Sequence, residues 1–126
     1  MRILQGIDLI KIKRVCRIYS KFKNKFLHRI FTNKEIRQIT KNEKKMMLRI
    51  AGKFASKEAA AKAIGLGISN GIKFKDFEIL NNENGKPEIK LTGEAQNRIN
   101  KIISSSVALS HDGEYLISVV TFISNE

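Results

Sequence analysis

The stretch "GKFASKEAAAKAIGLG", residues 52–67, decides which fold the chain is expected to adopt. It is rich in alanine, and it contains three lysines but a single acid, Glu58. Small residues along a helix let another backbone approach closely, so we expect Glu58 at a packed seam, where a buried carboxylate needs a partner. The residues that share its face at helical spacing are Ala51, Phe54, Ala55 and Lys62.

Spacing alone leaves two explanations for Glu58 open. The first, which spacing favours, is an ordinary helix pair with Lys62 at i+4, stabilising by roughly 0.2–0.5 kcal/mol. The second is a metal site, with Asp8 at the end of a predicted first strand supplying a second carboxylate. Two carboxylates together with substrate phosphates are a common way to hold Mg²⁺. Two acids fifty residues apart are, however, a weak signal.

The composition bounds the class of protein. The chain has 126 residues, 42% of them hydrophobic, which predicts one folded domain over residues 1–126. No apolar run of about 18 residues occurs, so no membrane span is expected. The N-terminal segment is interpreted as mature structure and not as a signal peptide. Cys16 is the one cysteine, which excludes an intrachain disulfide and suits a reducing cytosol.

The positive charge is concentrated in the first half of the chain. Residues 1–63 contain 18 Lys and Arg against 4 Asp and Glu, whereas residues 64–126 contain 6 against 8. Nine basic residues and no acid lie between Leu9 and Lys34. Such a surface attracts a nucleic acid, an anionic membrane, a phosphorylated cofactor or an acidic protein, and the plain alternative is a solvated basic face.

The order of predicted elements indicates an α+β fold with a mostly antiparallel sheet. Strands are predicted at 2–8 and 72–80, with hairpin turns at Asn84-Gly85 and Asp112-Gly113. Four helices are predicted. The first presents an apolar face with Ile12, Val15, Tyr19 and Phe22, and the second begins with a capping box from Thr32 to Glu35. A long helix runs from about Glu43 to Ile64 and is ended by Gly65, and the last helix covers residues 92–103 with Thr92 as N-cap.

Four motifs carry a resemblance to a known family. They are "GIDLIKIKR" (6–14), "KFASKEAAAKAIGLGI" (53–68), "NGKP" (84–87) and "SHDGEY" (110–115). In this order they resemble the signatures of the holo-[acyl-carrier-protein] synthases, small bacterial 4'-phosphopantetheinyl transferases. The resemblance implies the phosphopantetheinyl transferase fold, a small antiparallel sheet packed with a long helix, and a cytoplasmic homotrimer with active sites between subunits.

The resemblance also implies a reaction. The family transfers 4'-phosphopantetheine from coenzyme A to a serine of apo acyl carrier protein, releases adenosine 3',5'-bisphosphate, and so supports fatty acid biosynthesis. Asp8 and Glu58 match the family's Mg²⁺ ligands, and Lys62 would neutralise charge on the leaving phosphate. The expected base is a water held by the metal, by Glu58 or by Asp8.

Contacts with coenzyme A and with the carrier protein are implied at further positions. Lys53 stands where members often have Arg, Leu116 where they usually have Ala, and His111 is expected to make a contact without a catalytic role. His28 is expected to be structural or exposed. The expected coenzyme contacts are Lys53, Lys57, Gly65, Gly67, Lys86, Pro87, Ser110 and His111. The expected docking surface for the acidic carrier is Arg14, Arg17, Lys21, Lys25 and Arg29.

Two other classes of function compete with the enzyme. A basic nucleic-acid-binding module fits the charge, but neither the aromatic pattern of RNA-recognition domains nor a recognition-helix or zinc spacing is present. A purely structural trimer leaves the arrangement of carboxylates and lysine unexplained. We therefore expect an enzyme that acts on neither nucleic acid nor membranes.

Overall fold

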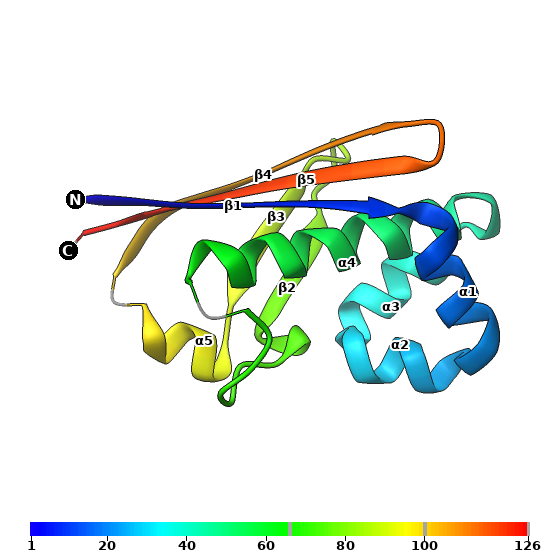
Figure 1. Ribbon diagram of the computed structural model, residues 1–126, viewed down its shortest axis with the longest axis horizontal. Helices are drawn as coiled ribbons and strands as arrows, with labels where there is room; N and C mark the ends of the chain where they lie inside the picture. Colours follow the sequence, from blue (N-terminus) through cyan, green and yellow to red (C-terminus); the bar gives the residue numbers. More distant parts are fainter. Residues whose placement is uncertain (66, 100, 126) are drawn as a thin grey trace.

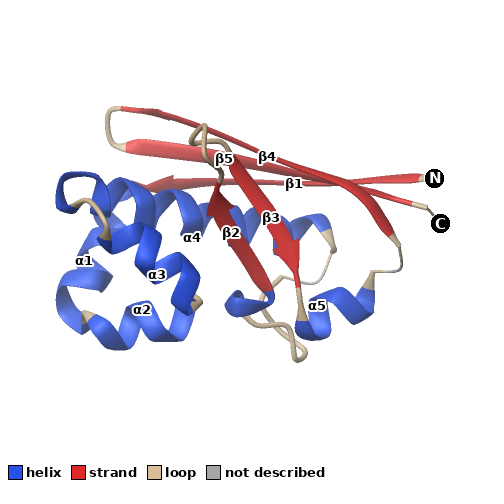
Figure 2. Ribbon diagram, turned by 180° about the vertical axis from the view of Figure 1, so that it is seen from behind, coloured by secondary structure: helices blue, strands red, loops and turns tan. Residues whose placement is uncertain are grey.

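The long helix α4 lies between a three-stranded antiparallel sheet and a two-stranded hairpin (Figures 1 and 2). The computed structural model describes residues 1–65, 67–99 and 101–125. The sheet has the order β1-β5-β4, and β2 pairs with β3. The strands are β1 Arg2–Lys11, β2 Phe77–Asn81, β3 Pro87–Leu91, β4 Ile102–Asp112 and β5 Tyr115–Ser124. The helices are α1 Ile12–Phe22, α2 Asn24–Ile30, α3 Asn33–Thr40, α4 Met46–Ala63 and α5 Gly93–Arg98, with short 3₁₀ turns at Glu43–Lys45 and Phe74–Asp76.

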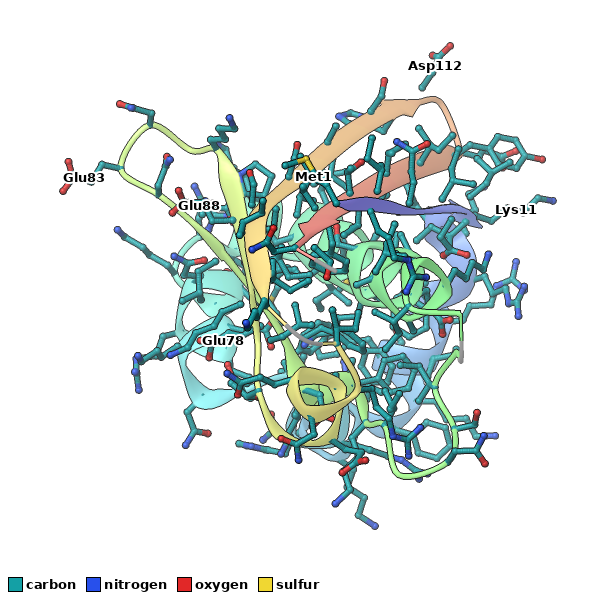
Figure 3. The ribbon with its side chains drawn as sticks, turned by 90° about the vertical axis from the view of Figure 1, so that its left-hand side faces the viewer. Met1, Lys11, Glu78, Glu83, Glu88 and Asp112 are labelled. Atoms are coloured by element: carbon teal, nitrogen blue, oxygen red, sulfur yellow. The ribbon has the colours of Figure 1, made fainter. Side chains whose placement is uncertain are left out.

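The helices α1 to α3 gather at one end of the molecule, and α5 lies at the other end, near both chain termini (Figure 1). The two hairpins project their turns outward: Glu83 and Asp112 stand at their tips, away from the body of the molecule (Figure 3). The predicted α+β class and both predicted hairpins are confirmed. Among the described residues, no helix is long and apolar enough to cross a membrane.

Helix α4 contributes to three apolar clusters, which makes it the central element of the core. Its alanines pack with Phe77, Val120 and Phe122 from the strands. Ile50 joins the cluster built by α1 to α3, and two further alanines pack against Leu116. Leu116, which departs from the family's usual Ala, therefore fills space over an alanine face of α4.

The alanine face of α4 accepts the backbone of β1 at Gly6. A Cβ atom built on Gly6 would lie 1.9 Å from the carbonyl oxygen of Ala59 and 2.6 Å from the amide nitrogen of Ala63. The expectation that small residues on α4 allow a second backbone to approach is thus confirmed. Because side chains alternate along a strand, Asp8 shares the helix-facing side of β1 with Gly6.

Two predicted elements differ from the structure, and Asp76 explains part of both differences. Residues 74–76 form a 3₁₀ turn and not a strand, because the Asp76 carboxylate accepts the amide N–H groups of Lys73 and Ala95. The helix predicted over 92–103 ends at Arg98, and Thr92 directs its hydroxyl to the carbonyl of Asp76 instead of capping that helix.

The remaining helix signals are confirmed. Thr32 and Glu35 form the reciprocal capping box at the start of α3. The long helix begins at Met46, after a separate 3₁₀ turn that contains Glu43. Gly65 follows its end with a φ of +85°, and its amide donates to the carbonyl of Lys62.

Candidate active site

The candidate site lies where the end of β1 meets the last turns of α4. Its centre is an ion pair between Lys62 Nζ and Asp8 Oδ1, 2.9 Å apart, and Lys62 also donates to the carbonyl of Ile7. Both charged groups line a pocket of about 320 Å³. The other residues of this pocket are Leu9, Ile10, Arg14, Val15, Ile18, Phe54 and Glu58.

The pairing of Lys62 corrects the interpretation that spacing favoured. We expected a helix pair between Glu58 and Lys62, but Lys62 bonds across the seam to Asp8. The cause is the close contact at Gly6, which brings β1, and with it Asp8, against the C-terminal half of α4. Within the described residues, no ion pair is formed by Glu58.

Glu58 is half-buried, and its environment disfavours the negative charge. Burial raises the pKa of its carboxyl above the ordinary value, the neighbouring charge of Asp8 raises it further, and Lys62 opposes the shift. The pocket therefore holds two carboxylates against the ammonium of Lys62. A cation bound beside both carboxylates would relieve their repulsion, which is the electrostatic setting of a divalent metal.

The donor set fits a metal that keeps most of its ligands from outside the chain. In the described part of the chain, no group of three or more His, Cys, Asp or Glu side chains could enclose an ion. Asp8 and Glu58 supply hard carboxylate oxygens, and Mg²⁺ is commonly bound through one or two carboxylates plus water and substrate phosphates. These two residues could therefore contribute carboxylate ligands to Mg²⁺, with the remaining ligands coming from outside the chain.

The structure divides the expected docking residues among three surfaces. Arg14 lines the pocket with Asp8, Glu58 and Lys62. Arg17 and Lys21 border a shallow groove on the outer side of α1, beside Cys16. Lys25 and Arg29 border an apolar groove between α1 and α2 formed by Ile18, Phe22, Phe26 and Ile30. His28 is exposed on α2, as expected.

The expectation that Lys53 and Lys57 contact coenzyme phosphates is not supported by their positions. Both side chains are buried beneath the β2–β3 hairpin, with exposed fractions of 3% and 0%. Lys53 Nζ donates to three oxygens, those of Gln38, Ile79 and Asn81. Lys57 Nζ donates to Glu35, Phe74 and Phe77. A phosphate could reach neither ammonium unless these bonds broke.

The other expected coenzyme contacts lie on accessible surfaces outside the Asp8 pocket. Lys86 and Pro87 line a pocket between the β2–β3 hairpin and β4, and Ser110 and His111 lie exposed further along β4. Gly65 and Gly67 have positive φ angles, and a Cβ atom built on either would have no heavy atom within 4 Å. Within one chain the structure does not unite these residues with the Asp8–Lys62 pair in a single pocket.

Three residues with structural roles at the site were not identified from the sequence. Gly6 determines how closely β1 approaches, and its signal was present in the Gly-x-Asp spacing. Ser56 and Ser118 form a buried hydroxyl pair 2.9 Å apart, which ties α4 to the β5 residue opposite Asp8. Both serines are ordinary in the sequence, and only the strand register reveals the contact.

Comparison with known proteins identifies the family. Residues 5–120 match the family model described as the 4'-phosphopantetheinyl transferase superfamily, and the chain belongs to that family. Within it, the chain is 40% identical over 116 residues to the holo-[acyl-carrier-protein] synthase of Campylobacter hominis, covering 91% of this chain and 93% of that protein. The predicted resemblance to these synthases, and with it the prediction of an enzyme of this kind, is confirmed.

Solved structures agree with this assignment. The Helicobacter pylori holo-[acyl-carrier-protein] synthase, in complex with coenzyme A, superposes with a TM-score of 0.83 at 36% identity, covering 95% of this chain and all of that chain. The Bacillus anthracis synthase, in complex with CoA (3',5'-ADP), has a TM-score of 0.79 at 30% identity, covering 97% of this chain and 96% of that chain.

Proposed function

We propose that the protein transfers 4'-phosphopantetheine from coenzyme A to a serine of apo acyl carrier protein, releasing adenosine 3',5'-bisphosphate, in the service of fatty acid biosynthesis. The observation that carries the proposal is the juxtaposition of Asp8, Glu58 and Lys62 in one pocket at the seam of β1 and α4. Hard oxygen ligands next to a cation suit the handling of a diphosphate. The family, and relatives with coenzyme A bound, support the choice of substrate.

Lys62 is suited to neutralising negative charge on the leaving phosphate. Its side chain is 53% exposed although it is paired with Asp8, so the ammonium can turn toward a ligand in the pocket without leaving the seam. Negative charge grows on the leaving group during transfer, and a cation aimed at that position stabilises the transition state more than the ground state.

Glu58 is the better of the two carboxylates for removing the serine proton through a water molecule. Among the described residues Glu58 forms no ion pair, whereas Asp8 is paired with Lys62, so the Glu58 carboxylate is the one available to accept a proton from a water molecule. Asp8, which accepts a hydrogen bond from Lys62 Nζ, serves in the proposal as a metal ligand.

Mg²⁺ fits Asp8 and Glu58, and when bound it would neutralise the diphosphate of coenzyme A and orient it for attack. The coenzyme contacts that remain in the proposal are Lys86, Pro87, Ser110, His111, Gly65 and Gly67. Lys53 and Lys57 are withdrawn, because their ammonium groups are occupied inside the protein.

A homotrimer with sites between subunits would bring these separate surfaces together. Support comes from apolar side chains left exposed on the sheet: Ile3 is 72% and Leu9 62% exposed on β1, and Ile103 is 53% exposed on β4. Large apolar side chains left exposed on a sheet are consistent with a face that another subunit covers. We place the reaction in the cytoplasm, in line with the single cysteine.

The test is a transfer assay. The protein is incubated with coenzyme A, Mg²⁺ and an apo acyl carrier protein, and the carrier is examined by mass spectrometry for added phosphopantetheine. Transfer by the wild type and its loss in Asp8→Asn are expected. If no carrier is modified while RNA or DNA is bound tightly at low salt, the basic nucleic-acid-binding module becomes the better proposal.

A further inference from the structure

The outer edge of β2 is closed by side chains and not by another strand. The edge consists of the backbone groups of Phe77, Ile79 and Asn81, which point away from the partner strand β3. Glu35 and Gln38 of α3, and Lys53 and Lys57 of α4, bond to these groups in turn. Ile79 N–H donates to Glu35 and Asn81 N–H to Gln38, while the carbonyls of Phe77, Ile79 and Asn81 accept from Lys57, Lys53 and Gln38.

Glu35 connects the edge of β2 to the helices α3 and α4. Its side chain is fully buried, and its two carboxylate oxygens accept three hydrogen bonds. Oε1 accepts from the amide of Thr32 and from Lys57 Nζ, and Oε2 accepts from the amide of Ile79 at 2.9 Å. One carboxylate thus joins the start of α3, the middle of α4 and the middle of β2.

The two lysines connect this edge to the helix that carries the candidate site. Lys53 and Lys57 are four residues apart on α4, and Lys57 directly precedes Glu58. Each ammonium has three protons, and each makes three hydrogen bonds, so neither has a donor to spare. The place of β2 relative to α4 is therefore fixed by directional bonds as well as by apolar packing.

We infer that Glu35 is a positioning residue for coenzyme binding, because it holds the β2–β3 hairpin, and thereby Lys86, at a fixed place on the body of the subunit. This inference rests on the proposed function and adds a residue far from the pocket to it. Lys86 directly precedes β3, at the end of the turn that β2 leads into, so a shift of β2 moves it.

Removing the Glu35 charge should loosen the edge. In Glu35→Gln, Lys57 is left as a buried cation without a counter-charge, and the new amide must present its NH₂ group to a donor on one side. We expect the amides of Ile79 and Asn81 to exchange hydrogen at least about tenfold faster, measured by NMR on the full-length protein. The KM for coenzyme A should rise by a similar factor, while kcat and the KM for the carrier change less than about twofold.

The control is Glu83→Gln, which removes the same charge from the exposed tip of the same hairpin and should change neither exchange nor kinetics. Glu35→Asp, which keeps the charge, should restore part of the coenzyme affinity. Urea titration of each variant establishes that the assayed protein is folded. If Glu35→Gln does not fold, Gln38→Leu opens the same edge at Asn81 and is measured in its place.

Three outcomes overturn the inference: unchanged exchange at Ile79, faster exchange with an unchanged KM for coenzyme A, or a fall in kcat alone. The last is what a loss of folded enzyme would give. Failure of the proposed function looks different, because wild-type protein would then modify no carrier. In that case direct calorimetric titration of coenzyme A into the wild type and Glu35→Gln decides the inference without turnover, and equal affinities overturn it.

Discussion

Lys62 and Asp8 meet across α4 and β1, with Nζ and Oδ1 2.9 Å apart, although Glu58 lies one helical turn from the same lysine. Glu58 thereby stays available to a ligand in the pocket that all three residues line. Because Asp8 shares its strand face with Gly6, the geometry of this pair depends on the backbone contact between Gly6 and Ala59.

Gly6→Ala should therefore disturb both the fold and the pair. The new methyl group would lie 1.9 Å from the carbonyl oxygen of Ala59, so β1 must move, and overpacking of this kind costs about 1–3 kcal/mol. Urea denaturation measures the loss. Gly52→Ala is the matched control, since its Cβ would meet Leu109 at 3.6 Å, and this helical glycine should tolerate alanine. Equal stability of the two variants would show that the contact at Gly6 is not a constraint.

Asp8→Ala and Glu58→Ala should each abolish most transfer activity while the fold persists. Each change removes one of two hard oxygen ligands, leaving the diphosphate without its full counter-charge. Chelator should abolish wild-type activity, and Mg²⁺ or Mn²⁺ should restore it. Isothermal titration with Mn²⁺ in the presence of coenzyme A should detect weaker binding in both variants. Near-normal turnover in either variant would be incompatible with the two-carboxylate site.

Lys62→Ala should lower kcat more than it raises the KM for coenzyme A. The reason is that charge on the leaving phosphate increases in the transition state, where the lost ammonium mattered most. Steady-state kinetics at saturating carrier separate the two constants. A change confined to the KM for coenzyme A would make Lys62 a binding residue only.

Arg14→Glu should raise the KM for the carrier strongly and that for coenzyme A hardly at all. Arg14 alone among the expected docking residues lines the pocket with the carboxylates, so it lies where an acidic carrier must approach. Reversal of Lys21 or Lys25 should have a weaker effect, and Arg37→Glu, a change on α3, should have none.

Added salt should narrow the difference between wild type and Arg14→Glu, because the Debye length falls from about 10 Å at 0.1 M to about 3 Å at 1 M. Unchanged carrier kinetics in Arg14→Glu, together with lost binding to RNA or DNA, would assign the basic surface to a different partner.

Lys53 should make the free energy of unfolding depend on pH in the alkaline range. Burial lowers its pKa from 10.5 to about 8, although Glu35 opposes the shift. Between these two values the unfolded chain binds more protons than the folded protein, so this group makes the free energy of unfolding rise with pH across that window. Each pKa unit corresponds to about 1.4 kcal/mol, so the rise is at most a few kcal/mol.

Urea denaturation from pH 7 to pH 10 measures this effect. Lys53→Met removes the titrating group and adds an unfavourable offset, because the carbonyl of Ile79 loses its donor. The difference in unfolding free energy between wild type and Lys53→Met should therefore grow toward pH 10. A constant difference would mean that Lys53 keeps its ordinary pKa in the folded protein.

Sequence motifs predicted the chemically reactive residues of the candidate site. They did not predict the features of the site that depend on packing between distant elements. Asp8, Glu58 and Lys62 were selected by motif, and the alanine face correctly indicated a close backbone. The same motif assigns Lys53 and Lys57 to phosphates, but both side chains are buried beneath the β2–β3 hairpin, bond to β2 and do not line the pocket. The position of β2 determines which lysines of α4 are buried against a strand and which can face a ligand. No local sequence pattern in α4 predicts that position.

Asp76 shows the same limit for the fold. The alternation over 72–80 resembles a strand, but the Asp76 carboxylate binds the nearby amide of Lys73 and also that of Ala95, 19 residues further along the chain, and converts the first half of this segment into a turn. Such long-range bonds override local propensity, whereas the capping box of Thr32 and Glu35 is local and was correctly predicted.

The edge of β2 has a consequence for how the chain behaves in a crowded cell. An open strand edge is a template on which another chain can add a strand, and proteins commonly protect such edges with charges, bulges or covering elements. Here the backbone groups of Ile79 and Asn81 are occupied by Glu35, Gln38 and Lys53, so no foreign strand can pair with them while the network holds. Variants that break this network should therefore aggregate from a nearly native state, with the opened edge of β2 as the first place where a strand of another molecule pairs.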